Sequence, residues 1–192
     1  MGGLDQERNG GRERRKRVPR PLDAASLQEL ALAYVARFAT SRAKLVTYCR
    51  RKLRERGWAG EGEPDIEALA DKIAGLGFLD DRAYAGMKAA SLLRRGYGKG
   101  RVRTALAASG IGEEDGAEAL ESADSGGVAA ALRFAERKRI GPYAVKEQDP
   151  AAREKAIAAM IRAGHSFTLA RRIVSASPDD LEDLVTKLDE CH

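Results

Sequence analysis

The chain has 192 residues, of which 43% are hydrophobic and only 5% aromatic, and its formal net charge is +5. Ala and Leu are abundant while runs of Val, Ile and Thr are scarce, a composition that favours an all-α protein. The longest apolar run, Leu30 to Ala39, is interrupted by Arg37 and is too short to span a bilayer. The N-terminus also lacks the apolar core of a secretion signal, so we expect a cytoplasmic protein with no membrane partner.

The first segment, residues 1–21, is rich in Gly, Arg and Pro. Its first twenty residues carry seven basic and three acidic side chains, which account for +4 of the net charge. The segment has too few apolar residues to offset the entropy lost on ordering, so we predict a disordered basic tail. Two interpretations of its charge remain open, contact with nucleic acid or simple solvation.

Three helices are predicted next, each from apolar residues at helical spacing. Ser41 is placed to cap the second helix, because its hydroxyl can accept from an unpaired N–H of the first turn. Proline is tolerated at the first helical position, so we expect the third helix to begin near Pro64 and to end at Gly75 or Gly77. The three expected helices cover 22–38, 42–56 and 64–77.

The segment from Gly77 to Ile111 predicts a helix, a glycine-rich turn and a second helix. Asp80 can cap the first of these helices, expected over 80–95, because its carboxylate accepts from backbone N–H groups. The apolar residues expected on one face of this helix are Tyr84, Met87 and Leu92. The glycines expected to break it are Gly96, Gly98 and Gly100.

The second helix of this segment is expected over 99–109. Val102 and Leu106 are four residues apart and therefore lie on one face. Gly110 ends the helix, and Ile111 is expected to fold back onto it. The remaining helices are predicted over 113–123, 128–139, 150–164, 167–175 and 179–190.

A repeat relates these segments. Gly57, Gly110 and Gly164 are 53 and 54 residues apart. The residues four before each glycine are Leu53, Leu106 and Met160, those eight before are Cys49, Val102 and Ala156, and those following are Trp58, Ile111 and His165. Units of about fifty residues are near the lower limit for independent stability. We therefore predict three tandem three-helix repeats packed end to end in an elongated, curved array.

The predicted divisions of the chain follow from this repeat. They are a tail at 1–21, three-helix repeats at 22–77, 78–125 and 126–176, and an acidic C-terminal helix at 177–192.

Basic and acidic side chains are segregated along the chain. Segment 42–56 has seven basic residues and one acid, segment 82–103 has seven basic residues and no acid, and segment 113–124 has six acids and no base. Surface ion pairs between adjacent helices are one interpretation, each pair worth about 0–1 kcal/mol. A basic groove that binds a partner along one side of the array is the other.

Gly96-Tyr-Gly-Lys-Gly is similar to a phosphate loop, but it lacks the Walker spacing and follows no predicted strand. A helix-to-helix turn accounts for its glycines. A weaker binding function is still expected, because Lys99 and Arg101 would lie at a helix N-terminus whose N–H groups favour a phosphate or carboxylate.

No pattern of catalytic or metal-binding residues is present. Asp80 and Asp81 have no acid–base partner nearby in the sequence, and Cys49 and Cys191 form no disulfide framework. His165 takes the Trp58/Ile111 position of the repeat, which predicts a half-buried turn residue. We therefore expect no enzyme activity, no metal and no cofactor.

Three stretches resemble the RecX family of bacterial regulatory proteins: Gly77-Phe-Leu-Asp-Asp-Arg-Ala-Tyr-Ala85, Arg95-Gly-Tyr-Gly-Lys-Gly-Arg-Val-Arg103, and Leu106 with Gly110-Ile111. A looser similarity over 25–176 includes Arg162-Ala-Gly-His-Ser-Phe167. The resemblance implies three three-helix repeats that bind in the groove of the RecA recombinase filament on single-stranded or duplex DNA and restrain its ATPase and strand exchange. Ala105 and Ser109 depart from the family pattern, which usually has an acid and a lysine there.

We hypothesise one main patch for contact with the filament or its DNA, on the second repeat of a monomeric protein. Its residues are Arg94, Arg95, Tyr97, Lys99, Arg101 and Arg103. The family-like positions expected to be structural are Gly77, Asp80, Asp81, Tyr84, Gly96, Gly98, Gly100, Leu106 and Gly110.

Two other functions remain open. One is a stand-alone nucleic-acid-binding protein whose basic helices contact the phosphate backbone, with Trp58 and Tyr97 as candidates for stacking on bases. It is not expected to read sequence, because no Asn or Gln lies between Arg95 and Gly127. The other is a protein scaffold that does not depend on DNA.

Overall fold

The computed structural model describes residues 20–145 and 149–177. This part of the chain forms nine α-helices and one 3-10 turn, and its only β-type pairing is an isolated bridge between Leu22 and Trp58. Residues 1–19 of the predicted tail and the predicted helix 179–190 lie outside the described residues. The helices are α1 (Ala24–Arg37), α2 (Arg42–Arg56), α3 (Ile66–Gly75), α4 (Asp81–Arg94), α5 (Lys99–Ala107), α6 (Glu113–Ser125), α7 (Gly127–Lys138), α8 (Pro150–Arg162) and α9 (Phe167–Ser175).

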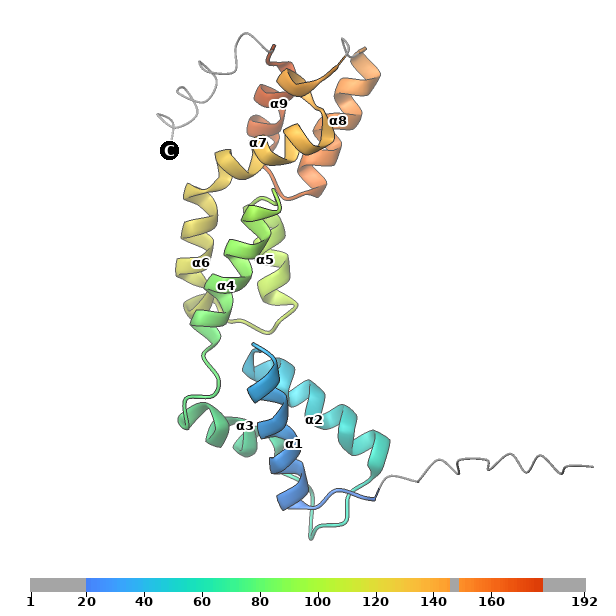
Figure 1. Ribbon diagram of the computed structural model, residues 1–192, viewed down its shortest axis with the longest axis vertical. Helices are drawn as coiled ribbons and strands as arrows, with labels where there is room; N and C mark the ends of the chain where they lie inside the picture. The colour runs from blue at the N-terminus through green and yellow to red at the C-terminus, as the bar shows by residue number, and fades with distance from the viewer. Residues whose placement is uncertain (1–19, 146–148, 178–192) are drawn as a thin grey trace, which may run out of the picture.

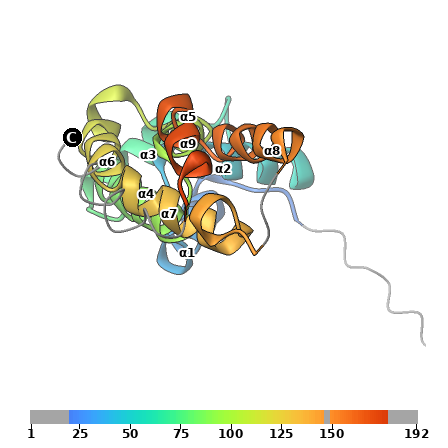
Figure 2. The ribbon, with the colours of Figure 1, turned by 90° about the horizontal axis from the view of Figure 1, so that it is seen from above.

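The helices form three successive groups of three along the long axis of a curved column (Figure 1). Seen from above, the groups lie over one another (Figure 2). We call α1–α3, α4–α6 and α7–α9 the first, second and third units. The prediction of an elongated, all-helical array is therefore confirmed.

Each unit has its own apolar cluster. Leu45 and Ile73 are buried in the first cluster, Val102 and Leu106 in the second, and Met160 and Ile173 in the third. The second and third clusters meet, because Ala130 of α7 is buried in the second and Tyr97 packs against both. The first cluster shares no residue with its neighbour. The column therefore has no single central core.

Helix starts follow the capping signals of the sequence. Ser41 accepts from the N–H of Lys44, and Asp80 accepts from the N–H of Ala83 at 2.8 Å. The predicted start of the third helix was wrong by two residues: α3 begins at Ile66, because Asp65 is its cap and accepts from the N–H of Ala68. Pro64 lies just before that cap.

The predicted apolar face of α4 is partly wrong. Tyr84 and Leu92 are buried, but Met87 is 50% exposed. Small residues decide which face is buried, since Ala85 and Ala89 are almost fully buried and lie close to α6. Met87 points away from the stripe that these residues form.

The glycine-ended helices of the repeat are confirmed most clearly in the second and third units. Gly110 and Gly164 have φ of +69° and +94°, a region that L side chains rarely adopt. The N–H of Ile111 bonds to the carbonyl of Leu106 at 3.1 Å, and the N–H of His165 bonds to that of Met160 at 3.1 Å. Both ends thus fold the following residue back onto the helix.

The same glycine turns join one unit to the next. The N–H groups of Gly98 and Gly100, at the start of α5, bond to the carbonyls of Ala163 and Gly164 at 2.9 and 3.0 Å. At the start of α2, the Ser41 hydroxyl bonds to the carbonyl of Ser109 at 2.5 Å. The C-terminal ends of α8 and α5 therefore meet the N-terminal ends of α5 and α2, the second helices of the preceding units.

His165 lies inside the joint between the second and third units. Its side chain is only 6% exposed, so it is a buried joint residue and not the half-buried turn residue that was predicted. Its Nε2 lies 3.1 Å from the carbonyl oxygen of Gly96, while Nδ1 is buried without a hydrogen-bond partner. Burial lowers the pKa of His165 below the ordinary histidine value, with the Gly96 carbonyl opposing that shift.

We predict that Gly164→Ala destabilises the protein by about 2 kcal/mol or more, because the left-handed backbone strains any side chain. The added methyl would also collide with the backbone of Arg101. Urea unfolding monitored by circular dichroism measures the change. Gly75→Ala is the matched control, since nothing lies within 4 Å of the position that its new Cβ would take. Equal stabilities of the two variants would contradict this account of the joint.

We also predict a stability loss below neutral pH that depends on His165. As pH falls through about 6.5, the unfolded chain takes up a proton on this histidine, whereas the folded chain does not because its pKa is lower. The free energy of unfolding therefore falls with pH in this range. His165→Gln keeps an N–H donor but does not titrate, so its stability should fall less between pH 7.5 and pH 5. Identical pH profiles would remove His165 as the cause.

Candidate functional site

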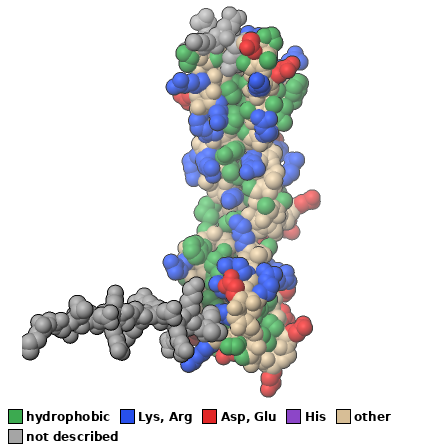
Figure 3. Space-filling model, turned by 90° about the vertical axis from the view of Figure 1, so that its right-hand side faces the viewer, with side chains coloured by type: hydrophobic (Ala, Val, Ile, Leu, Met, Phe, Trp, Pro, Cys, Tyr) green, Lys and Arg blue, Asp and Glu red, His purple; other side chains and the backbone are tan. Residues whose placement is uncertain are grey.

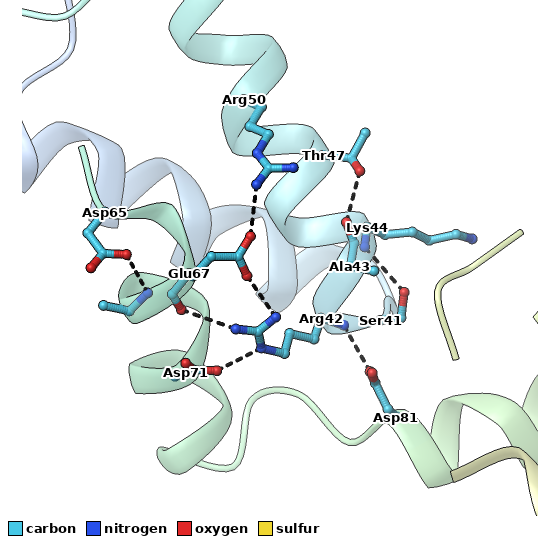
Figure 4. A network of polar contacts seen from close by, with 11 residues as sticks. Ser41, Arg42, Ala43, Lys44, Thr47, Arg50, Asp65, Glu67, Asp71 and Asp81 are labelled. Atoms are coloured by element: carbon cyan, nitrogen blue, oxygen red, sulfur yellow. Dashed lines mark hydrogen bonds and ion pairs between the residues drawn. The ribbon is translucent and has the colours of Figure 1, made fainter. Parts of the chain in front are cut away.

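Four of the seven basic residues of α2, the basic helix of the first unit, pair with carboxylates. Arg42 pairs with Glu67 at 2.8 Å and with Asp71 at 2.7 Å, both on α3 (Figure 4). Arg50 pairs with Glu67 at 2.9 Å, and Arg51 and Lys52 pair with Glu55 of their own helix. In this unit, the pairs of Arg42 and Arg50 join neighbouring helices, as the ion-pair interpretation of the sequence expected.

Two residues of α4 link the second unit to the start of α2. Asp81 accepts from the backbone N–H of Arg42 at 2.8 Å, and the hydroxyl of Tyr84 lies 2.6 Å from Lys44 Nζ (Figure 4 shows the Asp81 contact). Burial raises the pKa of Asp81 above the ordinary aspartate value, and the bond from Arg42 opposes that shift. A carboxylate at a helix N-terminus is electrostatically favourable, so Asp81 has a structural role at this joint.

Ser109 lies in the same joint. It is buried, its hydroxyl donates to the carbonyl of Ala105 at 2.8 Å, and its own carbonyl accepts from Ser41. Ser109, one of the two departures from the family pattern, therefore lies where two units join.

The charges of the second unit are compensated less completely. Segment 82–103 contains no acid, but acids of α6 lie close to it in the folded chain. Lys99 pairs with Asp124 at 2.8 Å, and Arg82 lies 3.7 Å from Glu118. The second unit thus has opposing acids that the local sequence did not indicate. In the second unit, the exposed arginines that form no ion pair with a described residue are Arg94, Arg95, Arg101 and Arg103.

Two arginines of the predicted patch lie close to the ring of Tyr97. The guanidinium carbons of Arg95 and Arg101 lie 5.3 and 6.0 Å from the ring centroid, within the range of cation–π interactions. Lys99 and Arg103 line a separate cleft of about 390 Å³ with Ser166 and His165. The structure therefore divides five of the six predicted residues between two neighbouring surfaces, and Arg94 lines neither of them.

The glycine-rich turn is a structural joint and not a phosphate loop. The N–H groups of Gly98 and Gly100 are already bonded to carbonyls of the third unit, and that of Arg101 is bonded to Gly98. A Cβ added at Gly98 would collide with the carbonyl of Gly164. The expectation that the start of α5 offers these N–H groups to a phosphate was therefore wrong, because the turn after α8 occupies two of them and the carbonyl of Gly98 occupies the third.

Two basic residues of the third unit join the surface around Tyr97, and the sequence analysis did not include them. Arg95, Tyr97, Phe134, Arg137 and Lys138 line one hollow of about 360 Å³. Arg137 donates a hydrogen bond to the carbonyl of Arg95, 42 residues away in the sequence, and lies 5.4 Å from the ring centroid of Phe134. In the sequence, only their position as two cations in the last turn of a helix could have pointed to Arg137 and Lys138.

Trp58 has a structural role. Its indole N–H donates to the carbonyl of Gly62 at 2.9 Å, and its ring packs beside Gly60. It therefore covers its own loop, and only Tyr97 of the two aromatic candidates lies beside the arginines of the second unit.

Lys and Arg side chains follow the length of one face of the column, while acidic side chains lie mainly toward its margins (Figure 3). This face is the side of the molecule where α2, α5 and α8 lie (Figures 1 and 3). The structure thus places basic side chains of successive units on a common face.

The chemistry of the described residues is limited. No group of three His, Cys, Asp or Glu side chains among them could hold a metal ion. Burial raises the pKa of the Cys49 thiol to about 11, which keeps it protonated and unreactive near neutral pH. Over the same residues, no helix is long and apolar enough to cross a membrane.

Comparisons with known proteins place these features in a family. The family described as "RecX, second three-helix domain" matches residues 80–120. Regulatory protein RecX of Myxococcus xanthus is 31% identical over 189 residues, covering 91% of this chain and 100% of the relative. The protein of the same name from Stenotrophomonas maltophilia is 31% identical over 170 residues, covering 88% and 94%.

The fold has solved counterparts. The crystal structure of RecX from Lactobacillus salivarius has a TM-score of 0.61 at 17% identity, covering 86% of this chain and 96% of that chain. A second crystal structure of regulatory protein RecX has a TM-score of 0.61 at 23% identity, covering 78% and 73%. The structural likeness extends the helical array over most of the chain, and the full-length sequence relatives establish that this chain belongs to the RecX family of regulatory proteins.

Proposed function

We propose that the protein binds the RecA recombinase filament on DNA and restrains its ATPase and strand-exchange activity, acting as a monomer without catalysis of its own. The observation that carries this proposal is the group of exposed arginines around Tyr97 that no described carboxylate neutralises. Family membership supplies the regulatory role, and the resemblance of residues 77–111 supplies the recombinase as partner.

The shape of the molecule supports this proposal. A column of three units presents basic side chains along one face, and such a face can contact several protomers of a filament or the DNA within it. Individually weak contacts add up when one rigid body carries them, because binding at one contact raises the effective concentration of the others.

The arginines divide into two classes with different expected roles. Arg42, Arg50 and Arg51 of α2 are engaged by Glu67, Asp71 and Glu55, so their removal mainly affects stability. The arginines at the end of α4 and on α5 form no ion pair with a described residue, so their charge is available to a partner. Arg94, Arg95, Arg101 and Arg103, with Tyr97, are accordingly the main contact patch, and Lys99 contributes less because Asp124 neutralises it.

We predict that Arg101→Glu/Arg103→Glu greatly weakens inhibition of the recombinase ATPase on single-stranded DNA. The concentration for half-inhibition should rise by about tenfold or more, because a lost hydrogen bond to a charged group costs about 1.5–3 kcal/mol and 1.4 kcal/mol is tenfold in affinity. Both residues are exposed, so circular dichroism should show unchanged helicity.

The control is Arg50→Gln/Arg51→Gln, which removes two arginines already paired with Glu67 and Glu55. It should leave inhibition within about twofold of the unmodified protein, as expected for surface ion pairs worth about 0–1 kcal/mol. Unchanged inhibition by the Arg101/Arg103 variant would exclude the patch from the contact.

A stand-alone nucleic-acid-binding protein is the second candidate, favoured by two guanidinium groups close to the ring of Tyr97. We expect naked single-stranded DNA to bind more weakly than the recombinase-coated strand. Affinity for the naked strand should fall by about 0.7 log unit per log unit of salt for each phosphate contacted. Equal affinity for the two forms in a salt series would instead favour the second candidate.

A further inference from the structure

The hollow between the second and third units has an unusual set of lining residues. We call it the Tyr97 pocket: about 360 Å³, lined by Arg95, Tyr97, Phe134, Arg137 and Lys138. It combines three cations with two aromatic rings, and no carboxylate is among its lining residues. It forms where the C-terminal ends of α4 and α7 meet, so residues of two units build one concave surface.

Contacts within the protein explain only part of this charge. Arg137 donates to the carbonyl of Arg95, and cations near helix C-termini are favourable there. Two helix ends supply only about one negative charge between them, at about half an elementary charge each. The three full positive charges of the pocket therefore exceed this negative charge by about two elementary charges. Neither Arg95 nor Lys138 forms an ion pair with a described residue.

The aromatic rings make part of the wall apolar. Tyr97 is half-buried, with Arg95 over its ring, and Phe134 is buried with Arg137 over its ring. An isolated phosphate or carboxylate would use the cations but not this wall. A ligand that fits both features carries an anionic group next to a flat or ring-shaped apolar group.

We propose that the Tyr97 pocket binds one nucleoside phosphate unit, with the phosphate on Arg137, Lys138 and Arg95 and the sugar or base against Tyr97. Guanidinium groups match phosphate oxygens through paired N–H bonds, and nucleobases stack on aromatic side chains without regard to sequence. The volume lies at the small end of ligand sites, about 300–1,000 Å³, and suits a single nucleotide rather than a folded peptide.

The nucleotide has two possible sources that share this chemistry, a single-stranded nucleic acid and a free nucleoside triphosphate. The proposal shares Arg95 and Tyr97 with the proposed function but does not require the recombinase. Its test therefore omits the recombinase and alters Arg137 and Lys138, whereas the function was tested through Arg101 and Arg103. Failure of one proposal can be told from failure of the other.

The experiment measures binding of the full chain by fluorescence anisotropy to two probes, a labelled oligothymidylate and a fluorescent ATP analogue. The variants are Lys138→Gln and Arg137→Gln/Lys138→Gln. Lys138 is exposed, and its side chain makes no hydrogen bond or ion pair with a described residue, so the single variant tests binding even if the double variant loosens the joint. Arg133→Gln is the matched control, because Arg133 is exposed on the same helix but does not line the pocket.

We expect Lys138→Gln to lower the affinity for the probe that binds by about tenfold, and the double variant to lower it further, as for the loss of hydrogen bonds to a charged group. The salt slope for the oligothymidylate should fall by about 0.7 for each phosphate contact removed. The control should bind within about twofold of the unmodified protein, as expected for an exposed charge that does not contact the ligand.

The pattern across the two probes identifies the source. Dependence on Lys138 for the oligothymidylate alone indicates a nucleic-acid strand, and the same dependence for the ATP analogue indicates a free nucleotide. Binding of neither probe at physiological salt, or binding that Lys138→Gln and the control change equally, would overturn the proposal. Displacement of both probes by polyglutamate at lower concentration than by oligothymidylate would also overturn it, because it would identify a carboxylate site.

Discussion

The architecture depends on backbone hydrogen bonds between the end of one second helix and the start of another. The carbonyls of Ala163 and Gly164 accept from the N–H groups of Gly98 and Gly100. Helix starts leave N–H groups unpaired, and helix ends leave carbonyls unpaired, so the contact satisfies both at once and aligns the two helix dipoles head to tail. This contact explains why α5 begins with glycines: a Cβ at Gly98 would prevent the approach.

That joint also determines where binding chemistry can occur. It uses the backbone N–H groups that a phosphate would need, which leaves side chains as the means of holding an anion. It also brings the end of α4 beside the end of α7, so Arg95 and Tyr97 face Arg137 and Lys138 across one hollow. The first unit differs because several cations of α2 already have partners: α3 lies beside α2 and supplies Glu67 and Asp71.

Local signals in the sequence predicted local structure well. Ser41 and Gly57 bracket α2 at the expected residues, and Asp80 and Gly110 act as cap and stop. In each case, the physical cause lies within a few residues of the signal. Asp65 was missed as the start of α3 because Pro64, a residue also suited to a helix start, stands beside it.

Properties that depend on distant residues could not be predicted in this way. Met87 has the spacing of a core residue, yet α4 buries its alanine face because small side chains allow close approach to α6. Asp124 neutralises Lys99 from another helix, and Arg137 reaches Arg95 from another unit. The candidate site was therefore half predictable: its arginines on the second unit were found, but their partners across the joint were not.

The two joints of the column differ in chemistry, and this difference affects what weakens each of them. The joint between the second and third units combines backbone hydrogen bonds with shared apolar packing through Ala130 and Tyr97. The joint between the first and second units relies more on polar groups, including the contacts of Asp81 with Arg42 and of Lys44 with Tyr84. The apolar clusters of these two units have no residue in common. Salt and low pH weaken charged contacts and leave apolar packing largely intact. Apolar packing that salt leaves largely intact thus helps to hold the second and third units together, whereas the polar contacts that attach the first unit include charged groups that salt weakens.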